Sequence, residues 1–322
     1  MTDIRSFIDR HFHHFNAREL REAARAYREH IEAGGKMMVT LAGAMSTAGI
    51  GKILALAIRE GWVHAITCTG ANLEEDAYRL IGHDSYQPLP YWRALRAEDE
   101  AALFEREMNR VTDTAIPDDI MIELEGQLLY RWKAACNSER SDTPAAFMLD
   151  ALRDEELKPK FQHPDESWLL AADDCDIPIW TPGWEDSTTG NSFTASVMKG
   201  ELPHHRCVET GTEQMQRLVR WYLKNCDPEP GIGFFQLGGG IAGDFSICVV
   251  PLITKDLKMK DTPVWGYFCQ ISEAATSYGG YSGAVPNEKI TWGKLEAETP
   301  KFMIESDATI VAPLIWAYLL EQ

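Results

Sequence analysis

Two short apolar runs near the N-terminus enclose a stretch with helical spacing. The runs are KMMVTLA (36–42) and VHAITCT (63–69). Between them, IGKILALAIREG (50–61) places apolar residues every three or four positions and ends at a glycine. A short strand, a helix and another short strand form a unit in which both strands run parallel. This order therefore predicts an α/β fold built on a parallel sheet.

A helix is expected directly before the first strand, over residues 16–35 (NARELREAARAYREHIEAGG). Asn16, with Glu19 three positions later, resembles a capping box. Gly34 and Gly35 provide the stop signal.

The strand pattern returns four times along the chain, and each apolar run is followed by a glycine-rich or polar turn. The runs are IPIW (177–180), GFFQLGG (233–239), VWGYFCQI (264–271) and KFMIE (301–305). Together these patterns predict a Rossmann-like, doubly wound, mostly parallel sheet with helices on both faces. In such a sheet the turns gather at the carboxyl edge of the strands, where ligands bind.

No break in composition marks a linker, so residues 1–322 are expected to form a single domain. The region 85–165 is rich in tryptophan, proline and charge. We expect it to be a helical elaboration packed on the sheet.

Acidic residues dominate the charge balance, with 31 Lys and Arg against 49 Asp and Glu and a formal net charge of −18. Such a chain repels polyanions, so no nucleic-acid partner is expected. A cationic small molecule would be attracted, although composition alone favours the simpler explanation, a surface charge that only aids solubility.

Cysteine usage and the N-terminus both suggest the cytoplasm. The seven cysteines contain no C-x-x-C pair, which is typical of free thiols in a reducing compartment. The first residues, MTDIRSFIDRHF, contain no apolar stretch typical of a signal peptide. No run of about 18 apolar residues occurs, so no membrane span is expected.

Several familiar patterns lack the spacing that their chemistry requires. GAMSTAGIGK (43–52) differs from a phosphate loop in its spacing and in having Ile53 where a magnesium-binding hydroxyl would stand. GGYSGA (279–284) does not bracket its serine as a nucleophile elbow does. No metal site is expected, because no recognisable ligand spacing links the candidate groups, which are His11, His13 and His14, His204-His205, and DDCD at 173–176.

Two turns that follow predicted strands have ligand-binding character. LGGGIAGD (237–244) offers backbone N–H groups close to a ligand, but it could equally be only a tight strand-to-helix turn. TGANLEED (69–76) carries Glu74 and Glu75, which could bind ribose hydroxyls or an amine. Acidic residues at a plain helix N-terminus are the competing explanation.

The segment ITWGKLEAE (290–298) places Lys294 beside Trp292. Only a neutral lysine amine can attack a carbon and form an imine, and burial in a dry cleft favours the neutral form. The alternative is a surface lysine whose stem lies over an indole.

These segments resemble the deoxyhypusine synthase family in order and approximate spacing, across residues 16–320. The resemblance rests on TLAGAMSTAG, TGANLEED, LGGG, SGAVPNEKITWGK and SDATIVAPL, of which E-x-x-x-W-G-K is the most specific. It implies an NAD-dependent aminobutyl transferase with a Rossmann-like fold, assembled as a homotetramer with active sites at dimer interfaces. Family members transfer the butyl fragment of spermidine through a lysine imine to an acceptor amine. Plant homospermidine synthases are similar and use putrescine as the acceptor.

The resemblance also implies roles for individual residues. Lys294 would form the imine, Trp292 would pack against the polyamine chain, and Glu288 would hold an amine end. NAD would lie along Thr47, Thr69, Gly70, Glu75, Asp186, Gly238, Gly239, Ser282, Asp307 and Ala308.

Three positions depart from the family pattern in the expected amine pocket. Asp244 replaces a histidine, Tyr281 replaces an acidic residue, and Asn191 replaces an aspartate. The leading hypothesis is therefore an aminoalkyl transferase that acts on polyamine substrates and uses a small amine as acceptor. The alternatives are a true deoxyhypusine synthase that modifies a protein lysine, and a non-catalytic regulator that binds polyamine and NAD.

Overall fold

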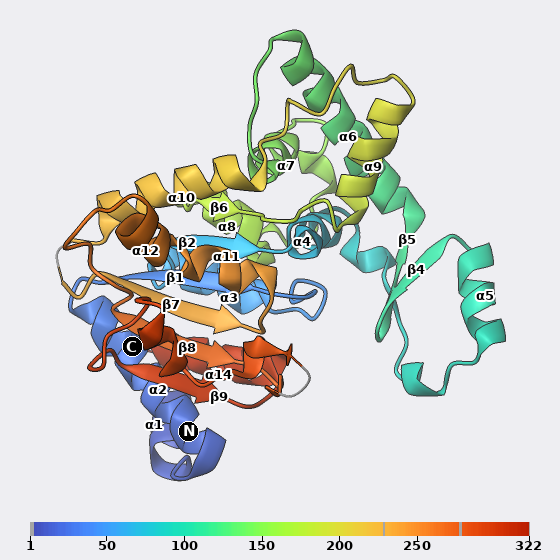
Figure 1. The fold of residues 1–322 in the computed structure, drawn as a ribbon. Coiled ribbons are helices and arrows are strands. Elements are labelled where there is room, and N and C mark those ends of the chain that lie inside the picture. The colour runs from blue at the N-terminus through green and yellow to red at the C-terminus, as the bar shows by residue number, and fades with distance from the viewer. Residues whose placement is uncertain (1–2, 228, 277–278, 322) are drawn as a thin grey trace.

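A six-stranded parallel sheet forms the centre of the molecule (Figure 1). The computed structural model describes residues 3–227, 229–276 and 279–321. The sheet confirms all six predicted strands, which are β1 (Lys36–Leu41), β2 (Ala65–Cys68), β6 (Ile179–Trp180), β7 (Ile232–Leu237), β8 (Tyr267–Ile271) and β9 (Lys301–Ile304).

The strands lie in the order β6-β2-β1-β7-β8-β9. Counted along the chain within this sheet, that order is 3-2-1-4-5-6, which is the order of a dinucleotide-binding Rossmann sheet. The direction of winding reverses between β1 and β7, which pair in parallel from Lys36 and Ile232 to Leu41 and Leu237. Ligands bind outside the carboxyl ends of the strands at such a reversal.

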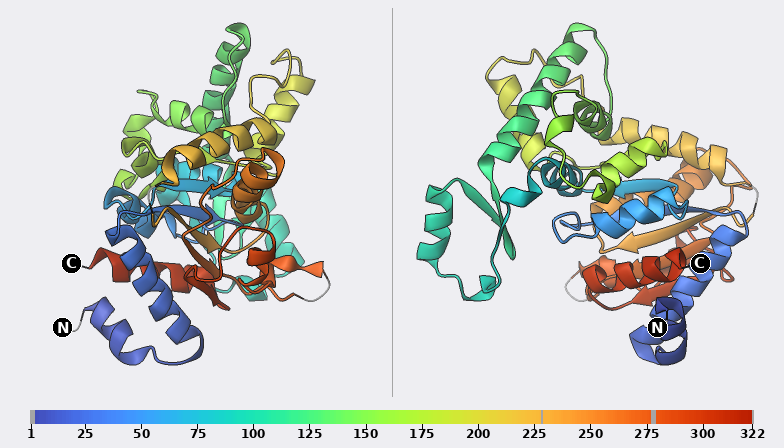
Figure 2. Two further views of the ribbon diagram at one scale, coloured as in Figure 1. Left: turned by 60° about the vertical axis from the view of Figure 1, so that its left-hand side comes forward. Right: turned by 180° about the vertical axis from the view of Figure 1, so that it is seen from behind.

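Side chains alternate between two apolar cores, one on each face of the sheet. Met37 and Val39 of β1 point into the larger core, and Met38 points into the smaller one. The larger core is closed by α2 (Phe15–Glu32), α3 (Gly51–Arg59), α4 (Gly70–Gly82), α8 (Trp168–Asp174) and α14 (Ala308–Leu320). The smaller core is closed by α10 (Gly211–Asn225), α11 (Ile241–Ile247) and α12 (Val249–Pro251) (Figure 2). The predicted doubly wound arrangement is confirmed.

The predicted capping box at Asn16 is wrong. Helix α2 begins at Phe15, and its N-cap residue His14 makes no side-chain capping bond. The Asn16 side chain instead binds a distant segment: its Nδ2 donates to the Glu305 carbonyl at 2.7 Å, and its Oδ1 accepts from the Glu305 amide at 3.2 Å. At the other end the prediction holds, because Gly34 has a φ of +93° and the Gly35 amide donates to the His30 carbonyl.

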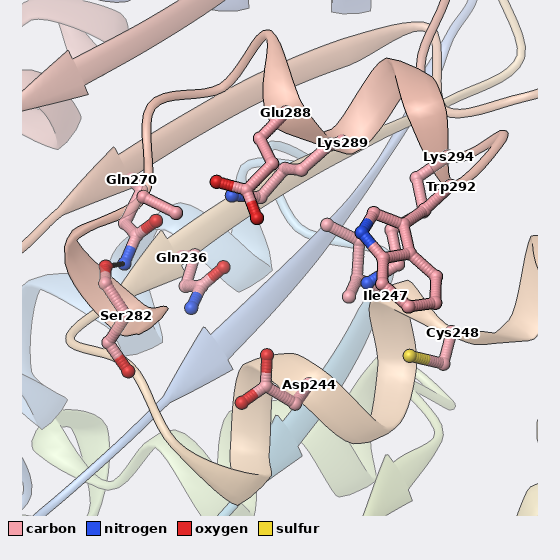
Figure 3. A pocket seen from close by; sticks show the side chains of 11 residues that line it. Gln236, Asp244, Ile247, Cys248, Gln270, Ser282, Glu288, Lys289, Trp292 and Lys294 are labelled. Carbon is pink, nitrogen blue, oxygen red and sulfur yellow. Dashed lines mark hydrogen bonds between the residues drawn. The ribbon is translucent and has the colours of Figure 1, made fainter. Parts of the chain in front are cut away.

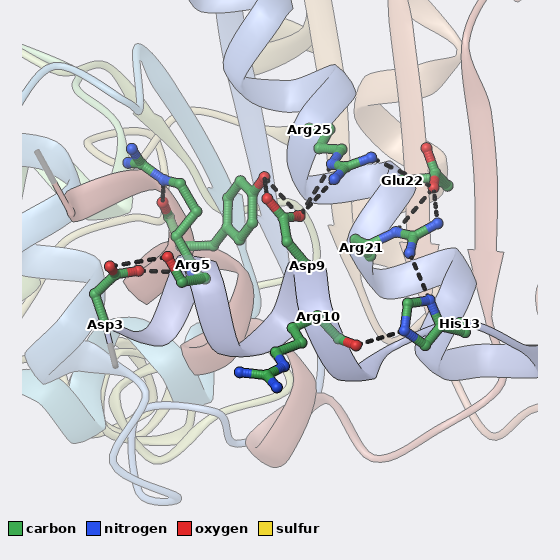
Figure 4. Close-up of polar contacts among 10 residues, drawn as sticks. Asp3, Arg5, Asp9, Arg10, His13, Arg21, Glu22 and Arg25 are labelled. Carbon is green, nitrogen blue, oxygen red and sulfur yellow. Dashed lines mark hydrogen bonds and ion pairs between the residues drawn. The ribbon is translucent and has the colours of Figure 1, made fainter. Parts of the chain in front are cut away.

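Helix α1 (Ile4–His11) connects the two ends of the chain (Figure 4). Arg5 Nε donates to the Tyr318 carbonyl at 3.0 Å, and the Tyr318 hydroxyl donates to Asp9 at 3.2 Å. Arg25 of α2 forms an ion pair with Asp9 at 2.9 Å. His13 bonds to the Arg10 carbonyl in the same network. The N-terminal helices are thereby fastened to α14.

The elaboration around residues 85–165 is not purely helical. It begins with η1 (His83–Ser85), β3 (Gln87–Pro88), η2 (Trp92–Ala94), α5 (Ala97–Glu105), β4 (Met108–Val111) and β5 (Thr114–Pro117). Its three strands form a separate antiparallel sheet, β3-β5-β4, in an arm that projects from the body (Figures 1 and 2). The β4–β5 turn contains no glycine and places Thr112 at a φ of +54°, so the usual hairpin signal is missing.

The remainder of the elaboration consists of α6 (Asp118–Asn137), α7 (Pro144–Leu152), η3 (Lys158–Lys160) and η4 (Pro164–Glu166). Helix α6 packs against α4, α7 and α9 (Thr188–Met198). It therefore rests on a layer of helices and not directly on the strands of the central sheet.

Candidate functional site

A cavity of about 350 Å³ lies at the carboxyl ends of β7 and β8 (Figure 3). Helix α11 borders it on one side, and α13 (Glu288–Thr291) with the loop that follows borders it on the other. Its lining consists of Gln236, Asp244, Ile247, Cys248, Gln270, Ser282, Ala284, Glu288, Lys289, Trp292 and Lys294. Five of the predicted site residues therefore meet here: Lys294, Trp292, Glu288, Asp244 and Ser282.

Two buried glutamines contributed by neighbouring strands line the cavity. Gln236 of β7 and Gln270 of β8 are partners in the parallel register. Gln270 Nε2 donates to the backbone carbonyls of Ser282 at 2.6 Å and Gly238 at 3.2 Å, which fixes the loops on both sides of it. Sequence analysis missed both residues, although a glutamine near the end of an otherwise apolar strand was a usable signal.

The three glycines after β7 serve different purposes. Gly238 and Gly240 have φ values of +79° and +66°, which glycine adopts without strain. A Cβ on Gly239 would lie 2.4 Å from Ser282 Oγ, and one on Gly243 would lie 2.4 Å from Gln236 Nε2. Gly239 thus lets Ser282 approach, and Gly243 lets α11 pack closely on its strand.

The glycines also complete a motif that sequence analysis missed. Positions 238, 240 and 243 form G-x-G-x-x-G between a strand and a helix, which is the pattern of a dinucleotide-binding turn. Here the motif follows β7, the strand at which the winding of the sheet reverses.

Lys294 reaches the cavity because the chain turns sharply after α13. Gly293 has a φ of +71°, and the Lys294 amide donates to the Lys289 carbonyl at 3.1 Å. The Lys294 ammonium lies 5.9 Å from the centroid of the Trp292 ring. The indole is 58% exposed, so it forms an open rim of the cavity and not the dry wall that the sequence suggested.

Lys289 is a second cavity lysine that sequence analysis missed. It is half-buried, and its Nζ lies 4.7 Å from the centroid of the Phe268 ring. Burial lowers the pKa of Lys289, and the positive charge of Lys294 lowers it further, while Asp244 and Glu288 act in the opposite direction. Its place within the NEKITWGK segment was the available signal.

A second group of predicted residues lies on the loops after β1 and β2. Thr69 caps α4 by accepting from the Asn72 amide at 3.2 Å, and its hydroxyl donates to the Gly43 carbonyl at 2.7 Å. Thr47 donates to the Glu75 carboxylate through both its amide and its hydroxyl. Burial raises the pKa of Glu75 to about 7, although the bonds from Thr47 lower it.

Gly70, at the start of α4, is needed for packing. A Cβ on this residue would lie 2.7 Å from the Cβ of Ser187 and 2.9 Å from the Trp184 carbonyl oxygen. The absent side chain therefore makes room for the loop after β6.

The remaining predicted residues lie away from the cavity lining. Asp186 and Asn191 are exposed, in the loop after β6 and on α9. Asp307 caps α14 by accepting from the Thr309 amide at 2.7 Å, and Ala308 is buried at the start of that helix. The side chain of Tyr281 lies outside the described part of the structure.

The described residues contain neither a metal-binding cluster nor a membrane-spanning helix. Within residues 3–227, 229–276 and 279–321, no group of three or more His, Cys, Asp or Glu side chains is placed to hold a metal ion. No helix in these ranges is long and apolar enough to cross a bilayer.

The winding order of the sheet and the glycine turn define a Rossmann-like α/β protein, and a lysine-containing cavity lies at the carboxyl ends of β7 and β8. Residues 10–319 match the family model "DS: Deoxyhypusine synthase". The chain belongs to the deoxyhypusine synthase family, which is a family of transferases.

Two relatives show the breadth of this similarity. The "Deoxyhypusine synthase-like protein" of Cyanothece sp. is 27% identical over 98% of this chain and 78% of its own length. The "Probable deoxyhypusine synthase 1" of Archaeoglobus fulgidus is 26% identical over 96% of this chain and 90% of its own length.

A solved structure shares the fold. The crystal structure of a "putative deoxyhypusine synthase" from Entamoeba histolytica has a TM-score of 0.59 at 13% identity. The alignment covers 98% of this chain and 92% of the other.

Proposed function

We propose that the protein is an NAD-dependent aminoalkyl transferase that moves an aminobutyl group from a polyamine donor to a small amine acceptor. The expected product is of the homospermidine type, with spermidine or a related polyamine as donor. The observation that carries the proposal is the position of Lys294, which lies in one cavity with an indole and two carboxylates at the carboxyl ends of β7 and β8.

The cavity residues suit a substrate with an alkyl chain and ammonium ends. Glu288 and Asp244 supply the negative charges that a buried ammonium needs. Trp292 offers an apolar surface to the methylene chain. The neutral Lys294 amine would attack the imine carbon of the oxidised donor, forming a bond from Nζ to that carbon while the bond to the departing amine breaks. The acceptor amine reverses this exchange and frees Lys294.

Residues on the loops after β1, β2 and β7 would hold NAD. Glu75 can accept hydrogen bonds from ribose hydroxyls, and the turn at Gly238 to Gly240 brings backbone N–H groups to the reversal of the sheet. The buried Tyr78 hydroxyl has no hydrogen-bond partner in the described part of the chain, and it borders a cavity of about 380 Å³ that Glu75 also lines. A polar group of a ligand fits there. When bound, NAD supplies the acceptance and return of hydride.

We further propose a cytoplasmic homotetramer in which a second copy completes each site. Asp186, Asn191 and Asp307 lie away from the Lys294 cavity of their own chain, which supports an assembly that brings them to the cavity of a neighbour. Leu56 of α3 and Ile310 of α14 are 51% and 61% exposed and offer apolar contact surface.

The second candidate is a true deoxyhypusine synthase that modifies a protein lysine. The exposed rim at Trp292 favours this alternative, because an open rim admits a lysine side chain that projects from a protein surface. The two candidates differ only in the acceptor.

Trapping the intermediate tests both candidates. The protein is incubated with NAD, labelled spermidine and putrescine, treated with borohydride, and mapped by mass spectrometry. We expect a labelled adduct on Lys294 and newly formed labelled homospermidine in solution. Lys294→Ala and Lys294→Arg should give neither, because a guanidinium stays protonated. Lys255→Ala is the matched control, since Lys255 lies 5.8 Å from the centroid of the same indole. Label on another residue would refute the role of Lys294, and label only on an added protein acceptor would favour the second candidate.

A further inference from the structure

The Lys294 cavity contains as many lysines as carboxylates. Lys289 and Lys294 face it together with Asp244 and Glu288. None of the ion pairs found among residues 3–227, 229–276 and 279–321 includes either lysine. Two ammonium groups therefore share a partly buried space without a carboxylate in direct contact.

Burial and the neighbouring charge of Lys294 together outweigh the two carboxylates at Lys289. The pKa of Lys289 is lowered, first by burial and then by the charge of Lys294, even though Asp244 and Glu288 both raise it. A ligand that brought only further ammonium groups would add to this repulsion. A ligand that brought a carboxylate could place that negative charge in direct contact with Lys289.

The arrangement of the side chains gives such a ligand a direction. Lys289 and Glu288 project from α13 on one side of the cavity, and Asp244 projects from α11 on the opposite side (Figure 3). Gln236 lies between these two sides, and Lys294 enters the cavity from the loop after α13. A chain with an anionic group at Lys289 and an ammonium group toward Asp244 would cross the cavity that Lys294 also lines.

We propose that Lys289 binds a carboxylate of the amine substrate, so that one of the two amines used by this protein is an α,ω-diamino acid. The inference rests on the proposed function in one respect, which is that this cavity binds the amine substrate. Lys289 is then a specificity-determining residue, and it does not take part in bond formation.

Matched pairs of ligands test the assignment. Ornithine and putrescine have the same diamine chain and differ by one carboxylate, as do lysine and cadaverine. Binding of each is measured by calorimetry on the full chain with NAD present, so no turnover is required. We expect the wild-type protein to bind each diamino acid at least about tenfold more tightly than its matched diamine, since one such contact is worth about a factor of ten.

Variants assign that preference to Lys289. Lys289→Met should abolish it, and Lys289→Glu should reverse it in favour of the diamines. Lys255→Met, which removes a lysine from beside Trp292 but outside the cavity lining, should leave it unchanged. Thermal melts verify that each variant is folded. If a variant is not folded, the comparison of diamino acids with diamines on the wild-type protein still tests the proposal.

The outcomes separate this inference from the proposed function. A wild-type protein that prefers the diamines, binds neither class, or keeps its preference in a folded Lys289→Met variant overturns the inference. Binding of diamino acids through Lys289 without any trapped adduct on Lys294 would support the inference and count against the proposed transferase. An adduct on Lys294 that forms with diamines alone would support the proposed transferase and count against the inference on Lys289.

Discussion

Two groups of charged side chains lie at the carboxyl edge of the sheet, and they differ in how their charges are satisfied. On α4, Glu74 accepts hydrogen bonds from the amides of Thr188 and Thr189 at 3.0 and 2.8 Å. In the cavity beside α13, Lys289 and Lys294 belong to none of the ion pairs in the described chain. Glu74 holds a neighbouring loop in place, whereas the cavity lysines make no ion pair within the described residues.

Asp76 shows the structural pattern most clearly. Its Oδ2 accepts from the Ser167 hydroxyl at 2.6 Å and from the Leu169 amide at 3.1 Å, at the start of α8. Burial nevertheless raises the pKa of Asp76 to about 6. A buried acid with a shifted pKa is therefore not by itself evidence of a ligand site, because hydrogen bonds to a helix terminus can fully account for its position.

The largest expected effect is on activity, and it follows from replacing Lys294 in the cavity. Lys294→Met should reduce turnover and adduct formation by at least about a thousandfold, because the proposed nucleophile is lost. Its free energy of unfolding should stay within about 0.5 kcal/mol of the wild-type value, since the lysine makes no ion pair to lose. Product analysis and chemical denaturation measure the two quantities. A large loss of stability would show that Lys294 has a structural role. The cavity lysines would then not differ from the α4 carboxylates in this respect.

The second effect is on stability, and it follows from replacing Asp76 of α4. Asp76→Ala should lower the free energy of unfolding by about 2–4 kcal/mol, because it leaves the Ser167 hydroxyl and the Leu169 amide buried without an acceptor. Asp256→Ala removes an exposed aspartate and should change stability by less than about 0.5 kcal/mol. Urea titration compares the two. Equal effects in both variants would mean that the α4 bonds do not stabilise the fold.

The third effect depends on pH and concerns Glu75. Its pKa is raised from 4.5 to about 7 in the folded protein, so the folded state binds this proton more tightly than the unfolded state does. Stability from this group is therefore present below about pH 4.5 and is lost as the pH rises towards 7.

Glu75→Gln removes this ionisation while keeping an oxygen that can accept from Thr47. The variant should match the wild type near pH 4.5 and exceed it by about 1–3 kcal/mol at pH 8. Thermal and urea denaturation at both pH values measure the difference. A difference that does not change with pH would show that Glu75 is already ionised without penalty.

The smallest effect tests how the glycine turn supports the cavity. Gly239→Ala places a Cβ against Ser282 and should lower stability by about 1–2 kcal/mol. The double variant Gly239→Ala with Ser282→Gly removes the colliding atoms and should recover most of that loss. Denaturation of the single and double variants measures the coupling. Additive losses would mean that the contact with Ser282 is not the reason for glycine at this position.

The central sheet was predictable because five of its six strands are buried on both faces. Such strands read as continuous apolar runs, and all six were recognisable in the sequence. The antiparallel arm was not recognisable, since β3 and β4 contain no buried residue and the β4–β5 turn has a threonine where glycine is usual. The predicted capping box at Asn16 was wrong for another reason. The side-chain amide of Asn16 binds the backbone of Glu305, a residue 289 positions away.

The cavity was predictable only in part. Lys294 and Trp292 belong to one short motif, so their proximity follows from the local sequence. Lys289 faces the same cavity from α13, where its ammonium lies over the Phe268 ring of β8, a residue distant in the sequence. Asp186 and Asn191 both come after β6, whose carboxyl end lies at the expected edge of the sheet. Asp186 lies in the loop that follows β6 and Asn191 lies on α9, and neither lines the Lys294 cavity. Local patterns therefore predicted which elements approach the edge, and packing decided which side chains meet.

The contact between Asn16 and Glu305 has a consequence for how copies of this protein behave at high concentration. β9 is an outer strand of the sheet, and an outer strand presents unpaired N–H and C=O groups to which another chain can add. Just beyond β9, the Asn16 side chain both donates to and accepts from the Glu305 backbone, as a neighbouring strand would. Helix α2 packs against the same strand. A side-chain amide thus occupies a place where edge-to-edge aggregation could begin.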